Sequence, residues 1–423
     1  MARRRAADGT TDLLPDRVPV FDHLSGSCRG VFHRAGYREI RTPLFEETAL
    51  YERSIGEATD VVGKEMFTVA KGSTSVSFRP EGTAGVVRAY LQHSLDKVRP
   101  FQKLYYVGPM FRYERPQAGR QRQFDQIGIE ALGSSSPMLD AEVIGVAMRC
   151  FEALELKNFS LALNTLGDPG DRARYREALR AHFQPLLGER CEDCRARFDK
   201  NPLRMLDCKA KGCQASNQSA PKMVDALTES SRLRFKTTLG LLRKLGVAYE
   251  IDPTIVRGLD YYTHTVFEVR CPDVGARSAI CGGGRYDGLI EELGGPALGA
   301  VGFAIGVVPT LVALEKQGHA SVTAKELDVD VLVVPVSDAE REAGFLLAHE
   351  LRAAGVSADT DYEERSLKAL FKQADKRGVK FTVVLGADEV AQSVAKVKDM
   401  RAGSETVVAR VDLGAELARR RSP

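Results

Sequence analysis

Two β-rich stretches decide the fold, KLYYVGPMFRYE at residues 103–114 and QFDQIGIEAL at residues 123–132. The polar and basic segment 115–122 separates them, and this spacing is typical of a hairpin with a long loop. We therefore expect two neighbouring antiparallel strands that form part of an antiparallel sheet.

The second of these strands predicts a small binding site. A side-chain period of two places Gln126, Gly128 and Glu130 on one face and apolar residues on the other. Because Gly128 has no side chain, we expect a gap over the sheet in which a small polar ligand lies, with Glu130 paired to an ammonium group. The first strand adds Arg112 and Glu114 on a shared face, and the planar guanidinium suits a phosphate or a carboxylate. An ordinary solvated sheet face is the alternative, because alternating polar positions are common.

The chain around the hairpin predicts the rest of the sheet. Apolar residues at helical spacing indicate a long first helix over residues 12–35. Residues 37–44 are extended, and Pro43 lacks the amide donor that a central strand needs, so we place them at an edge or an interface. A helical and charged pattern from 159 to about 246 indicates an insertion between strands, and the sheet resumes over residues 266–306.

After Gly318 the pattern changes to alternating strands and helices. Residues 327–335 and 381–386 are apolar runs typical of buried strands. Helical stripes follow Ser337 and cover residues 366–377, so this part predicts a separate three-layer α/β domain. We accordingly divide the chain into residues 1–320, with an insertion at about 165–250, and residues 325–423.

Composition excludes several classes of protein. The 423 residues contain 60 Lys and Arg against 57 Asp and Glu, so any contact with nucleic acid has to come from local clusters. The amino-acid usage excludes collagen-like and disordered proteins. The run 282–288 does not match the dinucleotide-binding spacing, and the sequence contains no Walker loop. Without a signal peptide or a long apolar run, we expect a cytoplasmic protein.

Half of the eight cysteines lie close together in the expected insertion, at Cys191, Cys194, Cys208 and Cys213. This spacing resembles a four-thiolate zinc knuckle. Reduced and partly buried thiols are the alternative, and both interpretations stay open. Any zinc held here would be structural, and we assign no metal ligand to the expected binding site.

Further motifs carry a family resemblance. FRYERPQ at 111–117 and RGLDYYTHTVFE at 257–268 resemble the second class motif and the histidine-specific signature of class II aminoacyl-tRNA synthetases, most closely the histidyl-tRNA synthetase family. Residues 9–15 resemble the opening of that family, and residues 41–43 its first, dimer-forming motif. The last domain resembles its anticodon-binding module.

The resemblance implies a fold and a function. The fold is α+β, a class II antiparallel sheet of six or seven strands flanked by helices, with a helical insertion and a C-terminal three-layer α/β anticodon-binding domain. The function is that of a homodimeric histidine–tRNA ligase. Such an enzyme activates histidine with ATP and Mg²⁺ to histidyl adenylate and transfers the histidyl group to tRNA(His).

The resemblance also implies roles for single residues. Arg112 and Arg257 are the catalytic residues, because two fixed guanidinium groups beside the α-phosphate stabilise the charge that develops there. The residues implied to bind histidine are Glu81, Gly82, Thr83, Arg112, Gln126, Glu130, Arg257, Tyr261 and Tyr262. Those implied to bind ATP are Arg112, Glu114, Arg120 and Arg257, and those implied to bind tRNA are Arg115, Gln117 and Arg122.

The sequence departs from the family pattern at one position. After residues 299–306 the third motif of the family continues with a glutamate and an arginine that stacks on adenine, and here Pro309 stands in place of that arginine. The lost stacking costs about 0.5–2 kcal/mol, or roughly two- to thirtyfold in ATP affinity, unless another side chain replaces it. Two alternatives therefore stay open: a synthetase-like regulatory subunit of histidine biosynthesis, and a paralogue that binds uncharged tRNA.

Overall fold

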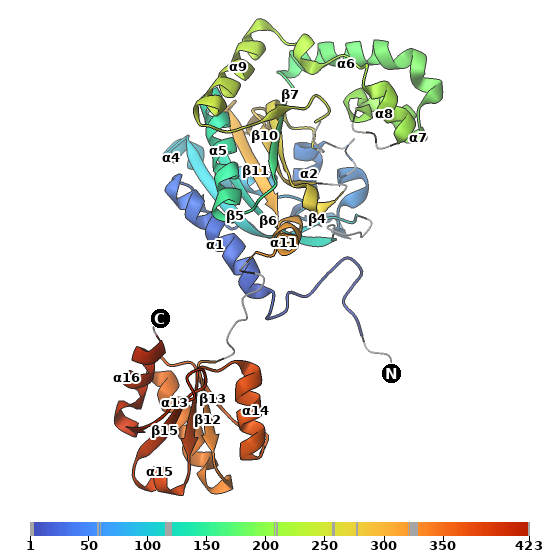
Figure 1. The fold of residues 1–423 in the computed structure, drawn as a ribbon. Helices are drawn as coiled ribbons and strands as arrows, with labels where there is room; N and C mark the ends of the chain where they lie inside the picture. The colour runs from blue at the N-terminus through green and yellow to red at the C-terminus, as the bar shows by residue number, and fades with distance from the viewer. Residues whose placement is uncertain are drawn as a thin grey trace. The chain divides into compact units, whose positions relative to one another are not determined.

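The computed structural model describes residues 4–56, 59, 61–114, 121–206, 208, 210–255, 259–275, 278–319, 321 and 329–421. The chain divides into two compact units, residues 1–323 and residues 324–423 (Figure 1). Among the described residues, no helix combines the length and the apolar character needed to cross a bilayer.

The first unit is built on an eight-stranded sheet. Its strand order is β1 (Arg38–Glu39), β5 (Gln102–Phe111), β6 (Gln123–Leu132), β11 (Ala300–Gly306), β10 (Ala279–Arg285), β9 (Thr263–Arg270), β7 (Ser160–Thr165) and β8 (Glu250–Ile251). The six inner strands are antiparallel to their neighbours, whereas the two-residue edge strands β1 and β8 pair in parallel. The predicted antiparallel sheet flanked by helices is confirmed. The predicted six or seven strands become eight because two edge strands are too short to leave a sequence pattern.

The predicted hairpin is confirmed and fixes the register of the sheet centre. β5 pairs with β6 from Gln102 opposite Leu132 to Phe111 opposite Gln123. β6 then pairs with β11, so that Gly128 lies between two other strands and not at an edge. Every side chain on this face of β6 therefore has neighbours on both sides.

The two faces of the sheet have different coverings. The face that carries Ile127 and Ile129 packs against α1 (Val18–Arg34), α5 (Pro137–Ala153) and α11 (Val307–Lys316), and this is the main core (Figure 1). The opposite face, which carries Tyr106, packs against α3 (Thr83–Gln92) and side chains of the insertion. That second face is where the polar residues of β6 lie.

The first helix ends for a local reason. α1 covers part of the predicted range 12–35, and Gly36 follows it with φ +80°, a conformation in which a side chain is strained. The segment predicted at an edge includes β1, which is the edge strand beside β5.

Sequence patterns missed a second sheet. An antiparallel three-stranded sheet is formed by β2 (Phe45–Glu47), β4 (Thr74–Phe78) and β3 (Thr68–Lys71). The helix α2 (Thr48–Ile55) lies between β2 and β3 in the chain. Its strands have no more than five residues, and their burial does not alternate cleanly. The pattern of period two that reveals a strand is therefore absent.

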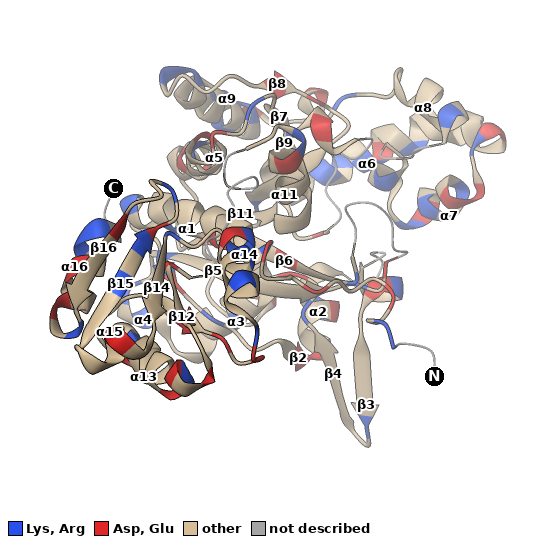
Figure 2. Ribbon diagram, turned by 60° about the horizontal axis from the view of Figure 1, so that its bottom comes forward, with Lys and Arg blue, Asp and Glu red and all other residues tan. Residues whose placement is uncertain are grey.

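The insertion begins later than residue 159, because residues 160–165 form β7 inside the main sheet. Its helices are α6 (Pro169–Phe183), α7 (Glu192–Lys200), α8 (Lys211–Asn217) and α9 (Glu229–Lys244). Basic and acidic residues are mixed along α6 and α7 (Figure 2). The insertion thus lies between β7 and β8 in the chain.

The second unit is a three-layer α/β domain. Its sheet has the order β13 (Ala358–Thr360), β12 (Val331–Pro335), β14 (Phe381–Leu385), β15 (Val394–Asp399) and β16 (Glu405–Ala409). The helices are α13 (Arg341–Ala353), α14 (Leu367–Arg377), α15 (Ala387–Ala391) and α16 (Arg410–Arg421). The predicted cap at Ser337 is confirmed, since its hydroxyl accepts from Ala339 N–H and Glu340 accepts from Ser337 N–H.

Candidate functional site

The floor of the site is an aromatic ring between two glycines. A Cβ atom at Gly128 would lie 2.4 Å from the Tyr106 ring, and one at Gly82 would lie 2.3 Å from it. Tyr106 stands opposite Gly128 in the β5–β6 register, and its side chain fills the space that the glycine leaves. The expectation of an open gap over Gly128 is therefore wrong.

Glu81 is held at the start of a helix. Its two carboxylate oxygens accept hydrogen bonds from Thr83 N–H at 2.7 Å and from Ala84 N–H at 2.9 Å, so the carboxylate caps α3. The Tyr261 hydroxyl donates to the same carboxylate at 3.4 Å. Burial raises the pKa of Glu81, and the hydrogen bonds from Ala84 and Thr83 oppose that change.

Glu130 lies next to it and is held by hydroxyl groups. One carboxylate oxygen accepts from Thr83 Oγ1 at 2.7 Å, and the other accepts from the Tyr286 hydroxyl. Burial raises the pKa of Glu130 to about 8, and the negative charge of Glu81 acts in the same direction. Thr83 thus joins the two acids, because its amide serves Glu81 and its hydroxyl serves Glu130.

The two acids have neutral partners only. Glu81 is 4% exposed and Glu130 is 1% exposed, and neither forms an ion pair with any residue in the described ranges. A buried carboxylate without a cation is unfavourable. Gln126 adds a buried side-chain oxygen that has no hydrogen-bond partner among the described residues. The arrangement is therefore suited to a small cation with several N–H groups.

Aromatic side chains form the wall of this site. The rings of Tyr261 and Tyr262 lie 4.8 Å apart between centroids, and the ring of Tyr286 lies 5.5 Å from that of Tyr261. All three are nearly buried. They give the acids apolar surroundings, in which a hydrogen bond to a charged group is strong.

Arg112 lies at the exposed margin of the site. Its Nε donates to the Pro80 carbonyl at 2.8 Å, and its guanidinium carbon lies 5.3 Å from the centroid of the Phe124 ring. Its Nη1 is 4.0 Å from Glu114 Oε1, which places both predicted residues on one side of the hairpin. The charge of Arg112 opposes the effect of burial on the pKa of Glu81.

Arg122 lies at the base of the hairpin loop. Its guanidinium carbon is 4.0 Å from the centroid of the Tyr113 ring, and its Nη1 donates to the Asp8 carbonyl at 3.3 Å. Its backbone N–H donates to the carbonyl of Gly9. The N-terminal segment therefore packs against Arg122, next to the start of β6. Predicted residues Arg115, Gln117, Arg120 and Arg257 lie outside the described residues.

Sequence reasoning missed two residues of the site, Tyr106 and Tyr286. Tyr106 lies in an apolar run, and such a run indicates a core strand as readily as a site. Tyr286 follows the glycines of β10, which were examined only for a phosphate-binding pattern. The β5–β6 register places Tyr106 beside Gly128, and a hydrogen bond from its hydroxyl places Tyr286 beside Glu130.

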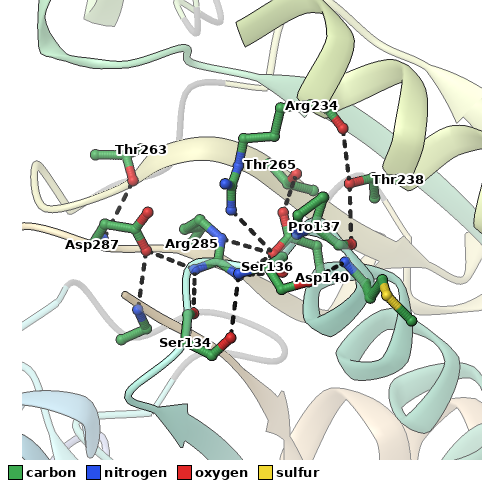
Figure 3. A network of polar contacts seen from close by, with 12 residues as sticks. Ser134, Ser136, Pro137, Asp140, Arg234, Thr238, Thr263, Thr265, Arg285 and Asp287 are labelled. Atoms are coloured by element: carbon green, nitrogen blue, oxygen red, sulfur yellow. Dashed lines mark hydrogen bonds and ion pairs between the residues drawn. The ribbon is translucent and has the colours of Figure 1, made fainter. Parts of the chain in front are cut away.

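A second buried polar cluster lies on the same sheet (Figure 3). Arg285 is fully buried, and its Nε donates to Asp140 at 2.7 Å while its Nη1 donates to Asp287 at 2.7 Å. Asp140 also accepts from the Thr265 hydroxyl at 2.7 Å. Opposite charges meet here within the protein, so this cluster joins α5 to the strands.

Pro309, the residue that departs from the family pattern, lies in a helix. Pro309 lies in the first turn of α11, where a proline is tolerated because the first amides have no partner inside the helix. A Cβ atom at Gly306 would lie 2.8 Å from Pro309 Cγ. The proline therefore fits the fold but offers no group that stacks on a base.

Comparisons with known proteins agree over the whole chain. The family model described as Histidyl-tRNA synthetase matches residues 9–309, and the one described as Anticodon binding domain matches residues 330–420. The histidine–tRNA ligase of Bacillus cytotoxicus is 45% identical over 406 residues, which cover 95% of each chain. That of a Synechocystis species is 46% identical over 94% of this chain and 88% of the relative.

Solved structures show the same fold. The apo histidyl-tRNA synthetase of S. aureus has a TM-score of 0.81 at 37% identity and covers 98% of this chain and 100% of its own. A Bacillus halodurans protein described as an ATP phosphoribosyltransferase regulatory subunit/histidyl-tRNA synthetase has a TM-score of 0.64 at 19% identity. That match covers 90% of this chain and 98% of the other, and it concerns the fold alone.

Proposed function

This chain belongs to the family of histidyl-tRNA synthetases, and on that premise we propose that Glu81, Thr83 and Glu130 hold histidine in the first unit. The enzyme is an aminoacyl-tRNA ligase. It activates histidine with ATP and transfers the histidyl group to tRNA(His). The observation that carries the proposal is the pair of buried carboxylates with neutral partners.

The amino acid fits these partners in chemical terms. Histidine offers a cationic ammonium group and, in its neutral form, one ring N–H that donates and one ring nitrogen that accepts. Glu81, Glu130 and Gln126 offer acceptors for the ammonium group and the ring N–H. Tyr261 and Tyr262 provide apolar surface for the ring, and Gly82 leaves the space that the Tyr106 ring fills. A side chain without ring nitrogens leaves these buried groups unpaired and is rejected strongly.

The activation of histidine with ATP takes place at the margin of the site. The carboxylate of histidine attacks the α-phosphorus of ATP, pyrophosphate leaves, and negative charge builds on the phosphoryl oxygens. Arg112 and Arg257 stabilise that charge, and Mg²⁺ neutralises the pyrophosphate when it is bound with ATP. Glu114 contacts the adenine side, and Arg120 contacts the outer phosphate. A ribose hydroxyl at the end of the tRNA then attacks the carbonyl of the adenylate and releases AMP.

The hairpin loop and the second unit receive the tRNA. Arg115, Gln117 and Arg122 contact the acceptor stem through phosphates and base edges. The second unit, which we take as residues 325–423, binds the anticodon, in line with the family model that matches it. Residues 1–320 form the catalytic domain with its insertion at about 165–250.

We also propose that the enzyme is a cytoplasmic homodimer. Two apolar side chains beside the first motif are exposed, Leu44 at 43% and Phe45 at 55%. A cavity of about 880 Å³ lies next to them, lined in part by Arg41, Thr42 and Pro43. Exposed apolar surface around a groove favours association of two copies.

The exchange of labelled pyrophosphate into ATP tests the activity. Exchange should depend on histidine, and the other amino acids should support none. Thr83→Val removes the hydroxyl that serves Glu130 and should raise the KM for histidine, whereas Thr83→Ser keeps it and serves as the matched control. Exchange that several amino acids support equally would overturn the assignment.

One observation favours a second candidate, a protein of this fold with weakened or lost adenylation that regulates histidine biosynthesis or binds uncharged tRNA. That observation is Pro309, where the family has an arginine that stacks on adenine. Pro309→Arg tests it, because a restored stacking contact should lower the KM for ATP about two- to thirtyfold. No exchange in the unaltered protein, together with exchange in the variant, would favour the second candidate.

A further inference from the structure

Four cysteines of the insertion meet outside the amino-acid site. Cys191 precedes α7, Cys194 lies in its first turn, Cys208 follows the turn at 202–205, and Cys213 lies in α8. Their sulfur atoms all lie within 4.8 Å of one another, and Sγ of Cys191 is 3.6 Å from Sγ of Cys208. Four Zn–S bonds of about 2.3 Å place tetrahedral sulfur atoms about 3.8 Å apart. A disulfide instead joins sulfur atoms at about 2.05 Å. The spacing therefore fits one tetrahedral ion.

The two short helices at the cluster bury few other side chains. α7 has nine residues and buries Cys194 and Phe198, and α8 has seven residues and buries Cys213 alone. Isolated helices of this length are marginal in water. The thiols occupy positions that apolar side chains take in an ordinary core. A metal ion bound by all four would therefore stabilise these helices.

A buried arginine lies beside the cluster. Arg190 is 2% exposed, and its Nη1 donates to the Cys213 carbonyl at 3.1 Å and to Asn217 Oδ1 at 2.8 Å. Its Nε and Nη2 have no hydrogen-bond partner in the part of the chain that the structure describes. One zinc ion with four thiolates carries a net charge of −2, and a buried guanidinium offsets part of it. Four neutral thiols provide no such partner.

We propose that Cys191, Cys194, Cys208 and Cys213 bind one Zn²⁺ as thiolates, and that this ion orders α7 and α8. Binding releases the thiol protons to solvent and changes no oxidation state. The same ligand set is closed, because four protein sulfur atoms leave no position for a substrate. The ion is structural and takes no part in adenylation.

The ordered segment reaches the amino-acid site through one side chain. Asn201 follows α7, and its Nδ2 donates to Asp260 Oδ1 at 3.2 Å. Asp260 directly precedes Tyr261, whose hydroxyl donates to Glu81. Asn201 is thus a positioning residue, and the zinc ion stabilises the segment from which it acts.

Metal content tests the proposal without any substrate, so its outcome is independent of the proposed activity. The full-length protein is purified without chelators from zinc-supplemented cells. Inductively coupled plasma mass spectrometry should then find one zinc ion per chain. The reduced apoprotein should take up one Co²⁺ and show the intense charge-transfer absorption of cobalt bound to thiolates. A protein that contains no zinc and takes up no Co²⁺ would overturn the proposal, as would a cluster oxidised to disulfides.

Variants locate the ion. Cys208→Ser and Cys213→Ser should each lose zinc, whereas Cys28→Ser, which changes a buried free cysteine outside the cluster, should keep it. Zinc retained in full by both cluster variants would place the metal elsewhere. Should a cluster variant fail to fold, the cobalt spectrum of the unaltered protein still identifies the ligand sulfur atoms.

The contact at Asn201 is tested by separating KM from kcat. Asn201→Ala should keep its zinc and raise the KM for histidine, with little change in the KM for ATP. Limited proteolysis after chelation should cut within 191–217 faster than before chelation, and added Zn²⁺ should restore resistance. Unchanged proteolysis after complete removal of zinc would contradict the ordering role.

Discussion

Two buried charged clusters lie on the same sheet and differ in their partners. In the Arg285 cluster the cation meets Asp140 and Asp287, so opposite charges are paired inside the protein (Figure 3). In the amino-acid site, Glu81 and Glu130 meet amides and hydroxyl groups, and no cation pairs with them among the described residues. Arg285 and Asp140 are fully buried and Glu81 and Glu130 nearly so, whereas Asp287 has 25% of its side chain exposed.

The difference separates a structural role from a binding role. A buried ion pair whose members satisfy each other needs no ligand, and removing one member leaves the other uncompensated. Two acids held by neutral donors retain capacity for a cation from outside. A buried charged group therefore indicates a binding site when no opposite charge of the protein pairs with it. The following predictions test this contrast.

The largest expected effect is on stability at the paired cluster. Asp140→Asn leaves Arg285 with one carboxylate fewer and should lower the free energy of unfolding by about 3–5 kcal/mol in denaturant titrations. Asp338→Asn breaks an exposed pair with Arg341 and is the control, for which we expect almost no change. Equal stability of the two variants would contradict the structural role of Asp140.

The opposite pattern is expected at the unpaired cluster. Glu130→Gln keeps the shape and the acceptor for Thr83, but it cannot take on the negative charge that pairs with a bound ammonium group. A charge-assisted hydrogen bond worth about 1.5–3 kcal/mol is therefore lost. Steady-state exchange should show the KM for histidine rising roughly tenfold to 150-fold, with the KM for ATP unchanged. The unfolding midpoint should not fall, because a buried carboxyl without a cation contributes little to stability. A lower midpoint with an unchanged KM would assign Glu130 a structural role instead.

The floor of the site should respond to a single methyl group. In Gly128→Ala the new Cβ meets the Tyr106 ring at 2.4 Å and the Phe303 carbonyl at 2.8 Å, and such overpacking costs about 1–3 kcal/mol. Gly26→Ala is the control, since α1 leaves open space there and alanine favours a helix by about 0.5–1 kcal/mol. Thermal unfolding should move in opposite directions for the two variants.

Stability should also depend on pH, and this effect is the smallest when it is measured over a single pH unit. The pKa of Glu130 is raised from 4.5 to about 8 in the folded protein, so between these values the folded state holds a proton that the unfolded state has lost. The free energy of unfolding should therefore fall as pH rises through this window, by at most about 1.4 kcal/mol per pH unit. Glu130→Gln should flatten the slope, and an identical slope in the variant would assign it to other groups.

The sequence predicts much of the fold because its strongest patterns are local. The alternation over 123–132 correctly indicates a strand with Gln126 and Glu130 on one face, and the capping box at Ser337 marks the start of a helical turn. Short strands such as β1 and β8 escape detection, because two residues contain no period. The strand β7 escapes detection for a different reason, because its six residues stand directly before a long helical region.

The interior of the site could not be predicted from such patterns. Tyr106 covers Gly128 because of the pairing between two strands, and register is a property of the pair. Arg285 and Asp140 are 145 residues apart in the chain, and no local sequence pattern around either residue predicts their contact. The meeting of the four cysteines depends likewise on how three short elements pack.

The tyrosine between two glycines has a consequence for the evolution of this protein. Positions 82, 106 and 128 come from the start of a helix and from two strands, yet they share one volume. A lineage that acquires a side chain at either glycine has to shrink residue 106 at the same time, or lose stability. The three positions should therefore vary together among descendants, so that a new amino-acid preference arises here by joint replacement rather than one residue at a time.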